Sequence, residues 1–313
     1  MEKDAWDVAK QKQKSYHNPP PGNRPCPWLM ICHGREFQRQ TFYDISEDRR
    51  HTKMIPDLRN KFILATSSRE WLFVEDRDSD DCSLWNPASL EKIRLPPLED
   101  LACSSCFLSS SPSDPQSFVL VVDVRKNVIG YCKPGEDTFR RHNVEPSISR
   151  ATIFKEEIFL MLENCELAIA DVENSELRVR ALGNKDINWS NPGCIPATRD
   201  YLISSDEDLL VVSEMIYTLP MGQIYGFIVF RMNFTEGIWE ELKSIGDRTI
   251  FLSTCGGISC SLKDSRVKKN AIYFVQHDDR HIHMYDLEDQ SISKASPCSN
   301  IDYHSSDLQW IML

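Results

Sequence analysis

Two histidines with strand spacing are the residues best suited to bind a metal. His281 and His283 lie two positions apart in a strand-like stretch, so their rings would point to one face. His277, Asp278 and Asp279 precede them and could add ligands. A zinc site needs three or four matched ligands, and no second cluster has suitable spacing. We interpret the segment as an exposed hairpin and expect no metal.

Paired cysteines are the next candidates for chemistry. Cys103 and Cys106 form one CxxC pair in a serine-rich stretch, without the second pair of a zinc ribbon. Redox activity would need a helix N-terminus or a basic neighbour to lower a thiol pKa, and neither is evident. Cys255 and Cys260 flank two glycines that favour a tight turn. We expect ordinary thiols at all four positions.

Sequence motifs of common enzymes are missing. The chain has no Gly-x-Ser-x-Gly elbow, phosphate-binding loop, dinucleotide fingerprint or His-Glu-x-x-His pair. We therefore expect no catalytic residues, no cofactor and no enzymatic activity.

One tryptophan stands apart as a candidate for partner binding. Trp189 lies in the polar, turn-rich segment 183–195, and tryptophan is a frequent anchor of protein interfaces. The predicted partner-binding residues are Trp189, Asn188 and Asn191. The alternative, in which Trp189 packs onto its own sheet, stays open. Three other tryptophans lie on apolar stretches and are expected to pack between sheets: Trp71, Trp85 and Trp239.

The elements that carry these residues are predicted to be strands. Short apolar runs rich in Val, Ile, Phe and Trp recur between clusters of turn residues, which is typical of an all-β protein. Clear examples are 61–65, 118–122, 209–212, 226–230 and 271–275.

A weak repeat organises the strands into blades. Six strand–turn–strand units recur at intervals of roughly 40 to 60 residues, close to the spacing of β-propeller blades. They begin at Phe42, Leu84, Ile129, Ala168, Ile228 and Met284. The pattern predicts a single β-propeller of six or seven blades, each of about four antiparallel strands. Trp85, Ile169, Val229 and Tyr285 should occupy equivalent strands, and the two longest intervals leave room for insertions. A β-sandwich with chance similarity between hairpins is the alternative.

Composition and charge limit the class of partner. Residues 1–27 are polar and end in a proline-rich run, so we expect a flexible arm before a propeller domain at 28–313. The net charge of −11 argues against binding to nucleic acid or to a membrane surface. The charged start lacks the apolar core of a secretory signal, which favours the cytoplasm or the nucleus and free thiols.

Four parts of the chain carry recognisable sequence motifs. They are Leu84-Trp85-Asn86-Pro87 with Leu95-Pro96-Pro97, the strand 68–72, the stretch 244–252, and 270–274 followed by 284–289. These segments resemble the plant F-box-associated β-propellers typed by the kink-suppressor F-box proteins, and the resemblance spans roughly residues 28–300.

The resemblance implies a protein-binding propeller that forms the substrate-recognition half of a ubiquitin-ligase adaptor. Family members typically carry an N-terminal F-box that docks a Skp1-type adaptor. Residues 1–27 are shorter than an F-box and lack its pattern, so we do not expect the chain to bind such an adaptor. The alternatives are a scaffold unconnected with ubiquitin, or an enzyme with a small-molecule site in the axial channel.

Overall fold

The structure is a computed structural model of the whole chain. It describes residues 26–66, 70–173, 175–184, 197–217, 223–253, 256–261, 267–275, 281–297 and 307–312. Residues 1–25, which make up nearly all of the expected arm, lie outside this set. Within the described residues, no helix is long and apolar enough to cross a membrane.

Six small β-sheets make up the fold, and we name them blades I to VI. From the innermost strand outward, blade I holds β25 (Asp307–Ile311), β1 (Trp28–His33), β2 (Arg39–Asp44) and β3 (Arg49–Lys53). Blade II holds β4 (Lys61–Ala65), β5 (Leu72–Asp76), β6 (Cys82–Trp85) and β7 (Lys92–Arg94). Blade III holds β8 (Ser105–Leu108), β9 (Val119–Asp123), β10 (Val128–Cys132) and β11 (Arg140–Asn143).

The second half of the chain forms the other three blades. Blade IV holds β12 (Ile148–Phe154), β13 (Glu157–Leu162), β14 (Leu167–Glu173) and β15 (Glu176–Ala181). Blade V holds β16 (Ala197–Ser205), β17 (Asp208–Ile216), β18 (Ile224–Asn233) and β19 (Ile238–Leu242). Blade VI holds β21 (Gly256–Ser261), β20 (Arg248–Ser253), β22 (Ala271–Val275), β23 (His281–Asp286) and β24 (Ile292–Pro297). Three single-turn helices connect strands: η1 (Arg35–Phe37), η2 (Pro56–Leu58) and η3 (Glu163–Cys165).

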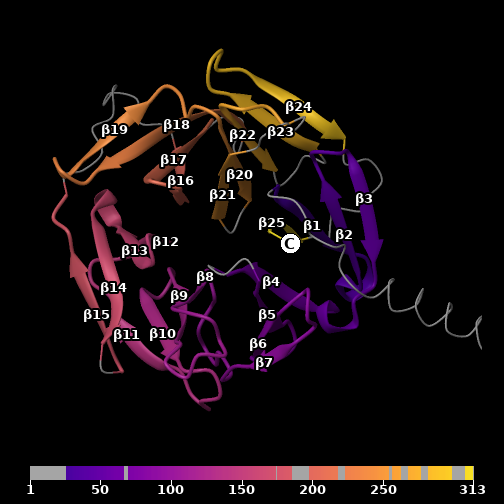
Figure 1. Cartoon of the computed structure of the whole chain (residues 1–313), viewed down its shortest axis with the longest axis vertical. Helices are drawn as coiled ribbons and strands as arrows, with labels where there is room; N and C mark the ends of the chain where they lie inside the picture. The colour runs from indigo at the N-terminus through magenta and orange to yellow at the C-terminus, as the bar shows by residue number, and fades with distance from the viewer. Residues whose placement is uncertain are drawn as a thin grey trace, which may run out of the picture.

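The blades form a closed ring, seen face-on in Figure 1. Neighbouring innermost strands contact one another all the way around the axis. Blade I is completed by two distant parts of the chain, because β25 pairs antiparallel with β1 and places Trp28 opposite Ile311. The predicted propeller is therefore confirmed with six blades, and the sandwich alternative is wrong.

The six predicted hairpins are the two outermost strands of the six blades. Their first strands are β2, β6, β10, β14, β18 and β23, and each lies next to the outer edge of its sheet. Trp85, Ile169, Val229 and Tyr285 lie on four of these strands, as predicted. Local alternation and turn residues therefore identified the outer half of every blade.

Blade VI departs from the four-strand pattern. Its strand β20 pairs in parallel with β22, and β21 then folds back antiparallel on β20 at the inner edge. This extra strand lies in one of the two intervals that were long enough for an insertion. The strand lies close to blade V: an added Cβ at Gly257 would approach Ile203 Cδ1 to 2.7 Å, so the Ile203 side chain would have to shift to accept a larger residue there.

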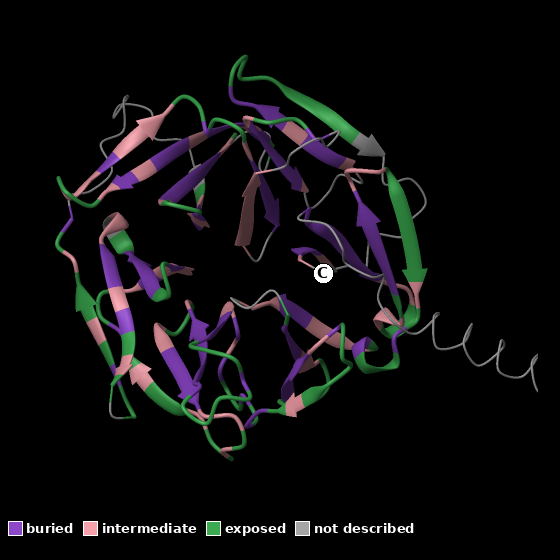
Figure 2. Cartoon of the chain, in the orientation of Figure 1, coloured by how far each residue is buried: buried purple, intermediate pink, exposed green. Residues whose placement is uncertain are grey.

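The cores lie between the blades, because each sheet buries both faces against its neighbours. Figure 2 shows buried residues mainly on the middle strands, intermediate residues along innermost strands such as β21, and exposed residues on the outer strands. The three tryptophans expected between sheets are buried, with 6% of Trp71, 1% of Trp85 and 6% of Trp239 exposed. Their predicted packing role is confirmed.

Candidate functional site

Residues 185–195 of the segment 183–195, which is predicted to bind a partner, lie outside the described residues. Asn188, Trp189 and Asn191 fall within 185–196, which connects blade IV to β16 of blade V. Their placement therefore stays a prediction. The residues on either side of the segment are described, and polar contacts fix them to the ring.

The N-terminal side of this segment is anchored by a buried asparagine. The Asn184 side chain accepts a hydrogen bond from Leu167 N at 2.6 Å and donates one to Cys165 O at 3.0 Å. The indole N–H of Trp239 in blade V donates to the same carbonyl at 3.1 Å. A buried amide with both ends paired holds the backbone in one place, so the loop leaves the ring from a rigid stem.

A group of charged residues around the buried Glu214 lies at the start of blade V, on β16 and β17. Glu214 pairs with Arg199 at 3.6 Å and accepts a hydrogen bond from the Tyr201 hydroxyl at 2.9 Å. Burial raises the pKa of Glu214 above its ordinary value, although Arg199 and Tyr201 both act to lower it. Arg150 of blade IV donates to the Asp200 carbonyl at 2.5 Å and links the two blades.

An exposed aromatic pair stands at the same end of blade V. Tyr217, which is 47% exposed and follows β17, lies with its ring 4.4 Å from that of the half-buried Tyr225 in β18. Ala197 pairs with Ile216, so the first residue of β16 and this aromatic pair lie at one end of the blade. The loop predicted to bind a partner therefore has an aromatic surface beside its return point.

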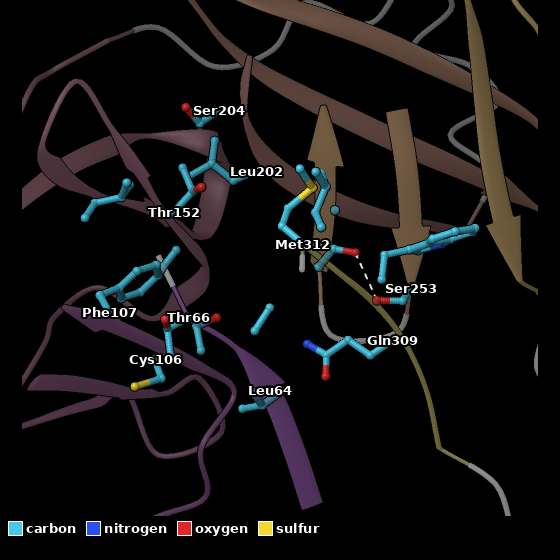
Figure 3. A pocket seen from close by; sticks show the side chains of 18 of the residues that line it. Leu64, Thr66, Cys106, Phe107, Thr152, Leu202, Ser204, Ser253, Gln309 and Met312 are labelled. Atoms are coloured by element: carbon cyan, nitrogen blue, oxygen red, sulfur yellow. Dashed lines mark hydrogen bonds between the residues drawn. The ribbon is translucent and has the colours of Figure 1, made fainter. Parts of the chain in front are cut away.

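The axis of the ring holds a second candidate site. A cavity of about 360 Å³ is lined by residues from all six blades, and its side chains converge in Figure 3. The lining includes 64–66, 104–107, 151–153, Leu202 with Ser204, Ser253 with 256–259, and Gln309, Trp310 and Met312. Within the described part of the chain, none of the lining side chains is charged. The cavity thus offers hydroxyl, amide and apolar groups to a neutral molecule.

Some of these polar groups are occupied by the protein and others are not. The orientation of the Gln309 amide follows from its hydrogen-bonding partners. Its oxygen accepts a hydrogen bond from Ala65 N at 2.7 Å and its nitrogen donates one to Ile63 O, which ties β25 to β4. The hydroxyls of Ser105, Thr152 and Ser204 make no hydrogen bond to another described residue, and all three residues are half-buried. They are the channel groups open to a ligand.

The motifs considered for metal or redox chemistry lie only partly within the described residues. His281 and His283 lie side by side, with ring centroids 6.3 Å apart, but no described group of three possible ligands could hold a metal ion. His277, Asp278, Asp279 and Cys255 lie outside the described residues.

The CxxC cysteines are buried thiols that do not form a disulfide. Burial raises the pKa of Cys106 well above its usual value. Burial also raises the pKa of the neighbouring Cys132 to about 12. A thiol with a raised pKa is a poor nucleophile, so this cluster is suited to packing.

Sequence reasoning did not identify the channel residues. Ser105, Thr152 and Ser204 lie on innermost strands, whereas the repeat was recognised from the outer hairpins. Thr152 and Ser204 each lie two strands before the first strand of an outer hairpin. A search for hydroxyl residues at that position would have found them, but it requires the strand order within a blade to be known.

Proteins from Arabidopsis thaliana are similar to this chain over most of its length. F-box/kelch-repeat protein At1g57790 is 24% identical, covering 79% of this chain and 70% of the relative. Putative F-box protein At5g66830 is 21% identical, covering 93% of this chain and 82% of the relative. F-box/kelch-repeat protein KIB1 is 23% identical, covering 86% of this chain and 69% of the relative. A solved protein from Lactobacillus plantarum covers 86% of this chain at 10% identity with a TM-score of 0.45, and we draw nothing from that likeness.

The family match covers most of the ring. The profile of the KIB1-4 beta-propeller matches residues 42–289, from β2 in blade I to the turn after β23 in blade VI. Its span includes the outer hairpins of blades II to V, most of that of blade I and the first strand of that of blade VI, and it agrees with the resemblance to plant F-box-associated propellers. The chain belongs to the KIB1-4 β-propeller family.

Proposed function

We propose that this propeller binds a protein partner and presents it for ubiquitination, as the substrate-recognition part of a plant F-box-type adaptor. The related proteins carry F-box in their names, which supports the link to ubiquitin ligases. The chain acts in the cytoplasm or the nucleus and performs no chemistry of its own.

The observation that carries the proposal is the closed ring of blades with both faces buried. β25 pairs with β1, completes blade I and so closes the ring. Large surfaces of the sheets are thereby used for packing, and recognition is left to connecting loops and the mouth of the channel. Binding by loops on a rigid scaffold is the usual division of labour in such folds.

Within this surface, we place the partner at the segment 185–196, with Trp189 as its anchor and Asn188 and Asn191 as adaptable polar contacts. The Asn184 stem limits the entropy that the loop loses on binding. The exposed ring of Tyr217 adds apolar area at the same end of blade V.

A second candidate function is suggested by the axial channel. Its neutral lining and open hydroxyls suit a small uncharged ligand, which would make the protein a ligand-binding propeller. General acid–base catalysis is not supported there, because the described lining has no titratable side chain except the Cys106 thiol.

The experiment is a proximity-labelling and cross-linking comparison in plant cells. The tagged wild type and Trp189→Ala should be expressed at equal levels. The expected result is one enriched partner whose ubiquitination rises with wild type and returns to background with the variant. A Skp1-type adaptor in the same complex favours the ligase role. Partners that are never ubiquitinated would contradict it and favour a scaffold.

A further inference from the structure

Two interfaces between neighbouring blades can be compared. One face of blade IV packs against blade III, and the equivalent face of blade V packs against blade IV. In blade IV, Val172 pairs with Leu177 across the outer hairpin. In blade V, Met232 pairs with Trp239 at the same place. The two outer hairpins can therefore be aligned residue by residue.

The inner pairing continues this alignment. Ile158 pairs with Ala170 in blade IV, and Val211 pairs with Phe230 in blade V. The equivalent pairs are Ala170 with Phe230, Val172 with Met232, and Leu177 with Trp239. At all three positions, blade IV carries the smaller side chain.

In blade V the large side chains fill the space against blade IV. Phe230, Met232 and Trp239 belong to one buried cluster with Phe154 and Phe159. Phe234, from the turn after β18, covers this cluster. Its ring stacks on Phe154 at 5.9 Å with an interplanar angle of 4° and meets Phe159 edge-on at 5.8 Å. An aromatic side chain therefore fits the outer end of this type of interface.

The corresponding space between blades III and IV is left open. A cavity of about 470 Å³ lies there, with Phe118 and Leu120 on one wall and Ile158, Ala170 and Val172 on the other. We call it the III–IV groove. The smaller Ala170 and Val172 side chains, where blade V has Phe230 and Met232, leave part of this space unfilled.

The rim of the III–IV groove is acidic. Glu156, Glu157 and Asp171 are exposed at its edge, and none of them forms an ion pair with a described residue. Lys133 is the one cation in the described lining, and its ammonium lies 5.3 Å from the ring centre of Phe118. Three carboxylates against one ammonium give the rim a net negative potential, which favours a basic partner and disfavours an anionic one.

We propose that the III–IV groove docks a protein segment that presents an aromatic side chain next to lysine or arginine. The aromatic ring enters against Phe118, in the way that Phe234 covers blade IV, and the adjacent cation meets the rim carboxylates. The inference rests on the proposed protein-binding function and assigns it a second contact point.

The test uses purified protein and a defined probe. A blocked pentapeptide Gly-Lys-Phe-Lys-Gly is titrated into the isotope-labelled wild-type chain and followed by NMR. Amide signals of 118–120 and 170–172 should shift. Two matched peptides, with Ala for Phe and with Glu for both Lys, should each bind at least about tenfold more weakly. Equal binding of the Glu-flanked peptide would overturn the proposal.

Two variants locate the binding. Ala170→Phe introduces the side chain found at the equivalent position of blade V and should reduce peptide affinity by about thirtyfold. Glu157→Lys leaves the groove open. It should lower the affinity for the basic peptide and raise the affinity for the Glu-flanked peptide. Glu91→Lys, an exposed change of the same charge on blade II, is the control and should have no effect. If Ala170→Phe does not fold, the Glu157→Lys variant provides the test. Binding of the basic peptide to Glu157→Lys with unchanged affinity would refute the proposed docking site.

The outcome is separable from that of the proposed function. The titration needs no cellular partner, so it stands whether or not a ubiquitinated partner is captured. Undiminished peptide binding by a folded Ala170→Phe protein refutes the groove and leaves the role of the segment 185–196 untouched.

Discussion

The indole N–H of Trp310 donates to the carbonyl oxygen of Leu252 at 3.0 Å and ties β25 of blade I to β20 of blade VI. The same indole meets the Phe251 ring edge-on, with centroids 4.8 Å apart, and only 2% of Trp310 is exposed. One side chain therefore supports the junction at which the ring closes.

Replacing Trp310 by Ala should lower the free energy of unfolding by about 3–5 kcal/mol, because it leaves a large cavity and an unpaired carbonyl at the junction. Equilibrium unfolding in urea measures the change. Lys92→Ala, at an exposed position of β7, is the control and should change stability by less than about 0.5 kcal/mol. A Trp310→Ala protein as stable as the control would mean that the closure does not depend on this contact.

Trp189→Ala separates binding from packing. If Trp189 anchors a partner, its loss should weaken partner binding by about thirtyfold while the melting temperature stays nearly constant. If Trp189 packs onto the propeller, stability falls and the folded fraction binds normally. Both quantities should be measured on one preparation, and unchanged binding with lost stability would remove Trp189 from the site.

Glu214 should make stability depend on pH in a defined direction. Because burial raises its pKa in the folded state, the folded protein binds more protons here than the unfolded chain does. The stability that Glu214 contributes to the folded state is fully present below its ordinary pKa of 4.5. This stability is lost as the pH rises through the higher pKa of the folded state. Stability measured from about pH 4 to about pH 7 should thus fall in wild type relative to Glu214→Gln. If wild type instead gains stability relative to Glu214→Gln as pH rises, the ion pair with Arg199 outweighs the effect of burial.

The buried thiols should resist alkylation in the native protein. Iodoacetamide at about pH 8 should modify the half-exposed Cys165 and Cys260 before Cys106 and Cys132, because burial keeps the latter two protonated. Peptide mass spectrometry before and after unfolding in guanidinium gives the order. Rapid native labelling of Cys106 would point to an opening between blades II and III.

The parts of the fold that could be predicted are those encoded locally. A strand, a turn and a second strand lie within about twenty residues, so alternation and turn residues reveal each outer hairpin. The pairing of Trp28 with Ile311 and the parallel pairing of β20 with β22 join segments that carry no local signal for each other. Both were therefore missed.

The candidate sites follow the same rule. Trp189 stands out by residue type in a polar stretch, and its role stays a prediction because it lies outside the described residues. The III–IV groove depends on the size of Ala170 relative to Phe230, and that comparison has meaning only once the strand registers are known.

Ring closure by β25 sets the order in which the protein can mature during synthesis. Blades II to V can each form as their own strands leave the ribosome, because all their strands are consecutive. Blade I can form only three of its four strands before Asp307–Ile311 emerge. Until then, the inner edge of β1 has no pairing partner. A nascent chain stalled before that point presents an open strand edge, which is a template for misassembly and a target for chaperones.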